Sequence, residues 1–228
     1  MRCAILQPSY LPWRGYFHQI EKVDLFVFYD DVQYDKHGWR NRNRIKTAAG
    51  PKWLTVPVSA RGAPVTGLPI NEVSIADEPW AEKHVRSIAQ TYAKAPHVDR
   101  ALSVIEPHLS RGHDRLADLT IDLTVALSHE LRIETEFMRS SELGVTGAKT
   151  DRLMAVLEKV GATHYLSGPS ARDYIDESRF GEAGISLEYM TYDYPEYDQL
   201  HPPYEPQVSI VDLLAMKGES APSSIWAR

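Results

Sequence analysis

The sequence predicts an α/β protein built on an open, mainly parallel β-sheet flanked by helices. Short apolar runs alternate with longer segments of helical periodicity, the order in which strands and crossover helices follow one another in such sheets. The run Leu25–Tyr29 is apolar or aromatic throughout, as expected of a strand buried on both faces. Three helical patterns then follow one another in the middle of the chain. We expect one domain, 1–228, with the helix-rich segment 76–132 as an insertion that could form a cap or subdomain.

The N-terminal elements are predicted from apolar runs and turn residues. Residues 2–6 form a short buried strand, and a proline-rich turn at 7–13 leads into a helix over 14–22. The run at 25–29 is the second strand. Residues 52–58 form another strand, in which Pro57 marks its end or a sheet edge, because proline cannot donate to the ladder.

Helices dominate the rest of the chain. The helical patterns of the middle segment cover 78–94, 99–108 and 114–131, and in the last of these leucines recur at helical spacing. We expect further helices over 146–160, 171–176 and 209–217, the first and last ended by Gly161 and Gly218. Strands are predicted at 134–138, 163–166 and 185–190.

Composition bounds the class of protein. The chain has 228 residues, of which 43% are hydrophobic and 25% charged, so intrinsic disorder is excluded. Cys3 is the single cysteine, which excludes a disulfide within the chain and a cysteine-based zinc site. The N-terminus has no signal-peptide layout, and no apolar stretch approaches the ~20 residues of a membrane span. We therefore expect a cytoplasmic protein without a membrane span.

Charge is distributed unevenly along the chain. The net charge of −6 disfavours nucleic acid as the dedicated partner. Seven basic residues and no acidic ones lie between residues 36 and 71, and the reverse holds between 180 and 216. The basic ones are Lys36, Arg40, Arg42, Arg44, Lys46, Lys52 and Arg61. Either the two segments dock on each other or face solvent, or the basic one forms a cationic pocket for a small phosphate- or carboxylate-bearing ligand.

Two candidate segments follow the first two strands, where ligands bind in open α/β sheets. In the first, residues 7–18, Gln7 could contact the ligand, Gly15 could permit close backbone approach and Arg14 could pair an anion. His18 could act as a base, unless the prolines and Trp13 only staple the turn to the core. In the second, Asp30 and Asp31 precede Gln33. These carboxylates could hold a metal, a ribose hydroxyl or an amine, or could form an ordinary turn.

The strongest local signal is the run Trp39-Arg-Asn-Arg-Asn-Arg-Ile-Lys46. If it is extended, one face carries Arg40, Arg42, Arg44 and Lys46, and the other carries Asn41, Asn43 and Ile45. Guanidinium groups recognise phosphate and carboxylate through paired hydrogen bonds. We expect this stretch to line a cleft near the Gln7 loop and Asp31. The alternatives are a helix, or an exposed arginine strand paired with the acidic segment.

Two later segments are weaker candidates. Residues 165–174 form a strand end, a small-residue turn and a helix start, typical of a phosphate site or of a structural turn. The residues that could bind there are Ser167, Gly168, Ser170 and Tyr174. Residues 189–204 hold five tyrosines and His201, and suit sugar or base stacking as well as loop packing.

No standard motif identifies a cofactor. The sequences HExxH, GxxxxGK[ST] and GxGxxG are absent, and no motif predicts a metal site. ATP remains a possible cofactor without a motif to support it. The oligomeric state is not encoded in any pattern.

Several of these segments together resemble the WbqC-like protein family. The resemblance lies in LQPSYLPWRGYF, DLFVFYDDVQY, GWRNRNRIKT with WLTVPV, YLSGPSARDYID and HPPYEPQVSIVDLLAMKG, and it covers nearly the whole chain. A fainter likeness runs to adenylyl-transferring α/β proteins such as pantothenate synthetase. Their HxGH signature is replaced here by Trp13-Arg-Gly-Tyr16, and a KMSKS-like sequence is absent, so this likeness bears on the fold alone.

The family resemblance implies a role in the biosynthesis of O-antigen, other surface polysaccharides or secondary metabolites. We expect a transferase or amide-forming ligase that attaches an acyl or aminoacyl group to the amine of a nucleotide-linked amino sugar. His18, Asp30 or Asp31 would orient or deprotonate the amine, and the Arg-Asn run would bind phosphates and hydroxyls. The alternatives are a non-catalytic ligand-binding or assembly protein of the same pathway, and a transferase that uses aminoacyl-tRNA.

Overall fold

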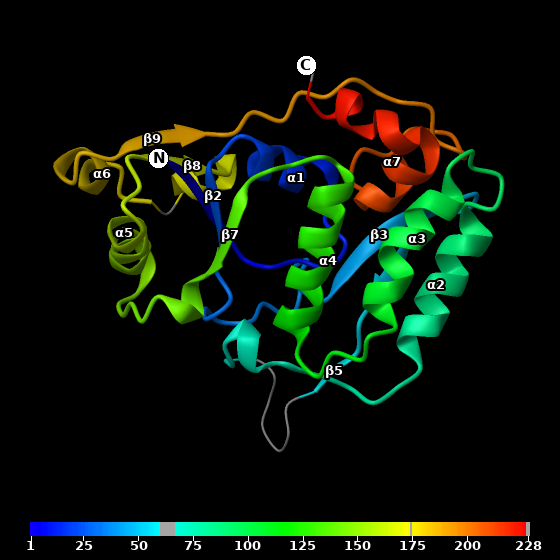
Figure 1. Ribbon diagram of the computed structural model, residues 1–228, viewed down its shortest axis with the longest axis horizontal. Coiled ribbons are helices and arrows are strands. Elements are labelled where there is room, and N and C mark those ends of the chain that lie inside the picture. The colour runs from blue at the N-terminus through cyan, green and yellow to red at the C-terminus, as the bar shows by residue number, and fades with distance from the viewer. Residues whose placement is uncertain (60–66, 174, 227–228) are drawn as a thin grey trace.

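A five-stranded parallel sheet forms the centre of the protein, as the alternation of elements predicted. The computed structural model describes residues 1–59, 67–173 and 175–226. The strand order is β7-β2-β1-β8-β9, and every neighbouring pair is parallel (Figure 1). The strands are β1 (Arg2–Leu6), β2 (Leu25–Phe28), β7 (Glu136–Arg139), β8 (His164–Ser167) and β9 (Ser186–Tyr189). The α/β prediction is confirmed.

Helices cover both faces of this sheet, so its central strands are buried on both sides. Ala4, Phe26 and Phe28 pack in one cluster with α1 (Arg14–Glu21) and α4 (Leu116–Glu130). The alternate residues of the same strands, such as Cys3 and Val27, pack in a second cluster with α5 (Lys149–Val160) and α6 (Ser178–Glu182). This alternation follows from the two-residue period of a strand and explains why β2 is apolar throughout.

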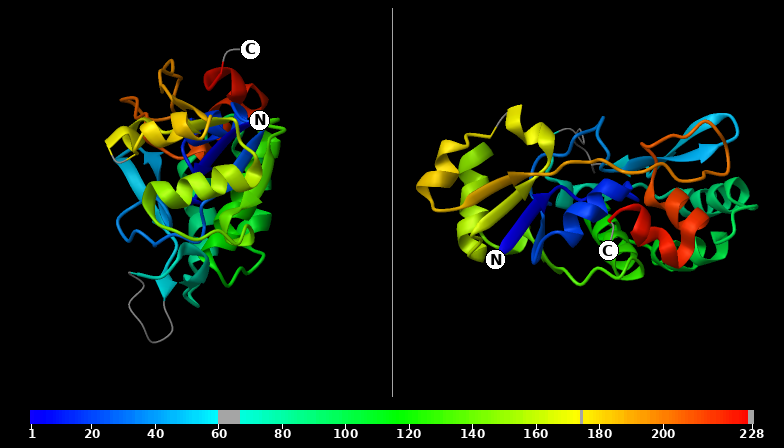
Figure 2. Two further views of the ribbon diagram at one scale, coloured as in Figure 1. Left: turned by 90° about the vertical axis from the view of Figure 1, so that its left-hand side faces the viewer. Right: turned by 90° about the horizontal axis from the view of Figure 1, so that it is seen from above.

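A second group of elements lies beside the sheet. It contains the antiparallel hairpin of β3 (Arg42–Thr47) and β4 (Gly50–Thr55), with α2 (Trp80–Thr91), α3 (Val98–Leu109) and α7 (Ile210–Lys217). Figure 2 shows these elements at one end of the molecule and α5, α6 and β9 at the other. Their buried side chains belong to the same apolar cluster as α1 and α4, so the helical segment 76–132 shares its core with the sheet.

The structure differs from the sequence prediction mainly at short elements. The expected strand 52–58 is divided at Pro57, with β4 ending at Thr55 and β5 (Val58–Ser59) pairing with β6 (Ser74–Ile75). The helix expected over 171–176 is a 3₁₀ turn at Pro169–Asp173, and α6 was not predicted. Further 3₁₀ turns lie at Ile70–Glu72, Ser140–Glu142 and Gly218–Ser224. Within the described residues, no helix is both long and apolar enough to cross a bilayer.

Candidate functional site

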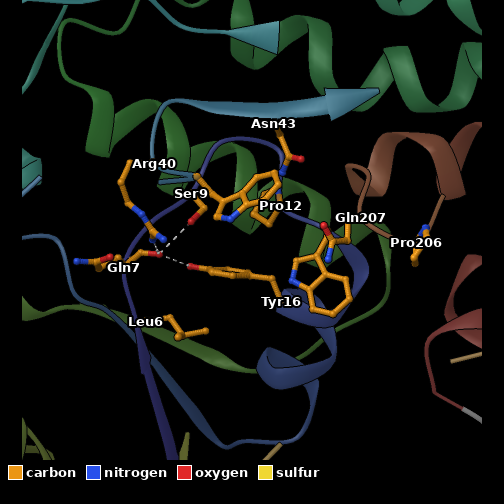
Figure 3. A pocket seen from close by; sticks show the side chains of 11 residues that line it. Leu6, Gln7, Ser9, Pro12, Tyr16, Arg40, Asn43, Pro206 and Gln207 are labelled. Carbon is orange, nitrogen blue, oxygen red and sulfur yellow. Dashed lines mark hydrogen bonds between the residues drawn. The ribbon is translucent and has the colours of Figure 1, made fainter. Parts of the chain in front are cut away.

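A cavity of about 450 Å³ opens at the carboxyl end of β1 (Figure 3). β1 is the strand at which the sheet order reverses: the chain first moves outward to β2 and β7, then returns to add β8 and β9 on the other side. Ligands of open α/β sheets bind at such switch points, beyond the carboxyl ends of the strands. The volume falls within the ~300–1,000 Å³ typical of small-molecule sites.

The cavity is bounded by three parts of the chain that are distant in sequence. The loop between β1 and α1 supplies one wall, the start of the β3–β4 hairpin a second, and the loop that precedes α7 a third. Apolar and aromatic side chains predominate among the lining residues. These residues are Leu6, Gln7, Ser9, Pro12, Trp13, Tyr16, Trp39, Arg40, Asn43, Pro206 and Gln207. A few polar groups on apolar walls are the usual composition of a specific binding pocket.

The backbone carbonyl of Gln7 is the polar centre of this site. It accepts hydrogen bonds from the Tyr16 hydroxyl at 3.1 Å, from Arg40 Nη1 at 3.0 Å and from Ser9 Oγ at 3.4 Å (Figure 3). The Gln7 side-chain amide makes no hydrogen bond to a described residue. One carbonyl thus fixes a phenol, a guanidinium and a hydroxyl on the cavity wall, while an amide remains available for a ligand.

Arg40 carries positive charge to the cavity without a counter-charge in contact. No carboxylate of the described residues lies within 4.0 Å of its guanidinium, and its buried Nε has no hydrogen-bond partner. Burial lowers the pKa of Arg40 from its ordinary value, an effect that Tyr16 and Asp35 partly oppose. The pKa of the Tyr16 hydroxyl is raised by burial, so it stays protonated as a donor. An anion bound here would supply the negative counter-charge that the Arg40 guanidinium lacks.

Asn43 joins the hairpin to the β1–α1 loop and so gives the cavity its shape. Its Nδ2 donates to the carbonyls of Tyr10 and Leu11, at 3.2 and 2.8 Å, and its Oδ1 accepts the Arg44 N–H at 2.8 Å. Leu11 has a φ of +41°, in the left-handed region that few side chains adopt. The Asn43 amide, buried among these carbonyls, holds the loop in that turn.

Gly15 makes room for an aromatic wall of the cavity. A Cβ at this position would lie 2.3 Å from the Trp13 indole, so only glycine allows the ring to lie against the first turn of α1. The Trp13 ring also meets Tyr192 and Tyr194 edge-on, with centroids 5.0 and 6.0 Å away. Gly15, which we expected beside a ligand, therefore acts through Trp13 in this structure.

The rest of the Arg-Asn run is extended, and its side chains lie in different environments. Arg42 and Arg44 lie on the outer face of the hairpin, where their guanidiniums contact Trp53. Asn41 is buried and donates to the carbonyl of Val56. Lys46 lies on the side of Arg42 and Arg44 in the alternation of β3, as expected, but it is buried, 4% exposed. Of this run, Trp39, Arg40 and Asn43 line the cavity.

His18 does not line the cavity. Its Nδ1 lies 2.8 Å from the Tyr194 hydroxyl, and its ring is close to that of Trp226. Burial, helped by the charge of Lys22, lowers the pKa of His18 to about 4. The imidazole is therefore neutral at pH 7 and packs against Tyr194 and Trp226.

Asp30 and Asp31 bind neighbouring segments of the same chain and do not line the cavity. Asp30 is completely buried and accepts hydrogen bonds from Ser141 N at 3.0 Å and Ser141 Oγ at 2.8 Å. Asp31 pairs with Arg152 and the Ser140 hydroxyl. These contacts tie the end of β2 to the turn after β7. Gln33 is exposed and forms an isolated bridge with Pro69.

The remaining predicted residues lie at the end of β8 and in the turn after it, or in the long segment 190–209. Ser167 ends β8, and its Oγ donates to the Tyr165 hydroxyl. Gly168 faces Tyr192, whose hydroxyl would lie 3.9 Å from an added Cβ. None of Ser167, Gly168, Ser170 and His201 lines the cavity. Tyr174 lies outside the described residues.

Comparison with known proteins places the chain in a family. It matches the WbqC-like protein family over residues 7–224. The chain belongs to the WbqC-like family. It is 42% identical over 223 residues to the uncharacterized protein Rv1507c of Mycobacterium tuberculosis, an alignment that covers 97% of this chain and 96% of its relative. No solved structure matches this WbqC-like chain.

Sequence reasoning did not select several residues that line the cavity of this WbqC-like protein. Ser9 and Tyr16 lie in the segment that drew attention to Gln7, and their closeness to it in sequence was the available signal. Pro206 and Gln207 lie about 200 positions away, and the sequence marked them only as part of the family segment HPPYEPQVSIVDLLAMKG, with no role assigned. In the described part of the chain, no group of three or more His, Cys, Asp or Glu side chains is arranged to hold a metal ion.

Proposed function

We propose that this WbqC-like protein binds a nucleotide-linked amino sugar in the cavity and transfers an acyl or aminoacyl group to the sugar's amine. The observation that supports this is Arg40, a guanidinium on the cavity wall with an unpartnered Nε and no carboxylate in contact. A sugar-linked diphosphate would supply the missing charge through paired hydrogen bonds. Gln7 and Ser9 would bind hydroxyls of the sugar, and the indole walls would pack on its apolar face.

The transfer itself needs an activated donor, which we take to be an acyl thioester or an acyl adenylate. The amine nitrogen attacks the acyl carbonyl carbon, a C–N bond forms, and the bond from that carbon to the thiol or phosphate breaks. The leaving group takes the electron pair, and the amine loses one proton to a base. Because no carboxylate or imidazole of the described residues lines the cavity, we assign the protein's contribution to positioning the two reactants, with solvent or the leaving group accepting the proton.

The same lining favours a second candidate, a protein that binds the nucleotide sugar without changing it. Its cavity residues with titratable side chains are Tyr16 and Arg40, neither of which is a ready base at pH 7. Such a protein would hand its ligand to another member of the pathway. It predicts ligand binding without product under any donor.

One experiment separates these functions. A panel of nucleotide amino sugars is incubated with the protein and either acyl thioesters, or ATP with amino acids, and the products are read by mass spectrometry. The transferase predicts the mass of an amide from at least one donor–acceptor pair. Arg40→Gln should weaken binding of that acceptor by about 10- to 150-fold, the value of a hydrogen bond to a charged group.

A matched control removes a guanidinium elsewhere. Arg179→Gln takes the same charge from α6, where Arg179 pairs with Asp151 on the surface, and should leave binding unchanged. Equal loss in both variants would mean that only net charge matters. Binding that survives Arg40→Gln would remove Arg40 from the site, and binding without product across the panel would favour the carrier.

A further inference from the structure

Two exposed indoles lie together on the outer face of the β3–β4 hairpin. Trp39 is 38% exposed and Trp53 is 44% exposed, and their ring centroids are 5.3 Å apart. The register of the hairpin sets Trp53 directly opposite Arg44, so both point to the same face. Large aromatic surface left in solvent costs free energy, and paired rings of this kind often serve as binding surfaces.

Two guanidiniums accompany these rings. Arg42 lies 4.5 Å from the centroid of Trp53, and Arg44 lies within 5.7 Å of both indoles. Arg42 donates to the carbonyls of Gly38 and His37, and no carboxylate of the described residues pairs with it. Arg44 donates to the carbonyl of Gln207, and its one acidic neighbour, Glu205, is 3.7 Å away.

This platform, which we define as Trp39, Arg42, Arg44 and Trp53, is continuous with the cavity. Trp39 belongs to both, because it lines the cavity and pairs with Trp53. Gln207 connects the two, since it lines the cavity and its carbonyl accepts a hydrogen bond from Arg44 of the platform. A ligand that fills the cavity can therefore extend over the hairpin without leaving the protein surface.

We propose that the platform binds the nucleoside diphosphate portion of the ligand, with the base stacked on the exposed indole surface and the phosphates between Arg40 and Arg42. This inference rests on the proposed function, whose sugar it assigns to the cavity. The chemistry favours a nucleotide over other ligands: a neutral glycan would not need the guanidiniums, and an acidic peptide would not need the stacked rings. Base–aromatic stacking also tolerates any base, which fits a surface without base-specific polar groups.

Calorimetric titration with base-containing and base-free probes tests the assignment. The probes are UDP, CDP, GDP and dTDP, with inorganic pyrophosphate as the base-free control. Wild-type protein should bind at least one diphosphate more tightly than pyrophosphate. Trp53→Ala should weaken that diphosphate by about 5- to 150-fold, the value of one stacked base. The same variant should change pyrophosphate binding less than twofold, whereas Arg40→Gln should weaken both probes.

Two control variants test whether the effect depends on the aromatic ring of Trp53. Trp53→Phe keeps an aromatic ring and should recover most of the affinity, and Met138→Ala removes another exposed apolar side chain, on β7, and should change nothing. The platform assignment fails if Trp53→Ala leaves diphosphate affinity within twofold, or if no diphosphate binds better than pyrophosphate. Binding of a five-nucleotide RNA strand at least tenfold more tightly than any diphosphate would assign the surface to nucleic acid instead.

The outcomes distinguish this inference from the transferase proposal. Trp53-dependent binding of a diphosphate without any amide product would support the platform assignment and contradict the transferase proposal. Amide product from an amino sugar that lacks a nucleotide, with no diphosphate binding, would support acyl transfer and contradict the platform assignment.

Discussion

Replacing Asp30 with alanine distinguishes a structural carboxylate from a catalytic one. Asp30 is 0% exposed and accepts hydrogen bonds from the N–H and hydroxyl of Ser141 at 3.0 and 2.8 Å, with Ser140 Oγ at 3.2 Å. A hydrogen bond to a charged group contributes about 1.5–3 kcal/mol. The two hydroxyls can rotate to other acceptors, whereas the Ser141 N–H cannot. We therefore expect the free energy of unfolding to fall by about 3 kcal/mol in total.

Urea unfolding, followed in parallel by tryptophan fluorescence and far-ultraviolet circular dichroism, measures this change, and coincident curves justify a two-state treatment. Asp30→Asn should lose less than Asp30→Ala, because its amide oxygen can still accept the Ser141 N–H. Asp151→Ala, which breaks an exposed ion pair with Arg179, should cost ~0–1 kcal/mol. A stability of Asp30→Ala within 0.5 kcal/mol of wild type, roughly the effect of an ordinary surface change, would refute the structural role.

Two further changes follow from burial and close packing. Gly15→Ala would bring a Cβ to 2.3 Å from the Trp13 indole and push that ring from the cavity wall, so both diphosphate affinity and stability should fall, the latter by about 1–3 kcal/mol. Gly181→Ala, with no atom within 4 Å of the new Cβ, is the control and should be neutral in both titration and urea unfolding. Burial lowers the pKa of His84 to about 4 from 6.5, so the folded protein binds this proton less well than the unfolded chain. The contribution of His84 to stability should therefore be complete above pH 6.5 and be lost as the pH drops toward 4, by up to about 3 kcal/mol, beside a similar loss from His18. His84→Gln should remove the His84 share of that decline, and an unchanged slope would contradict it.

Much of the sheet could be predicted because its strands are apolar on both faces. Leu25–Phe28 has no polar residue to obscure the pattern, and α4, one of the helices that cover the sheet, repeats its leucines at helical spacing. The short strands β4 and β5 were harder to predict, because a single proline decides where one ends and the other begins. Pro57 separates β4 from β5, a break that the sequence could place only as a strand end or an edge.

The site was only partly predictable, for a physical reason. Polar residues collect at the carboxyl ends of parallel strands whether they bind a ligand or tie loops together. Gln7 follows β1 and lines the cavity, whereas Asp30 follows β2 and binds the turn after β7. The sequence shows the same kind of signal in both places. What distinguishes them is which distant segment folds over each strand end, and for Gln7 that segment includes Gln207.

The charge asymmetry of the sequence can now be read residue by residue. Mutual docking of the basic and acidic segments would give each guanidinium a carboxylate, but among the described residues Arg44 and Glu205 form the single ion pair between them. The buried Asp212 of the acidic segment accepts hydrogen bonds from two tyrosine hydroxyls and an amide, and the buried Lys46 of the basic segment acts on it through its charge without a contact ion pair. Arg40 and Arg42 consequently keep positive charge beside the cavity. Because holding such charge without a partner costs free energy, the binding of an anion proposed above would gain free energy by supplying the counter-charge.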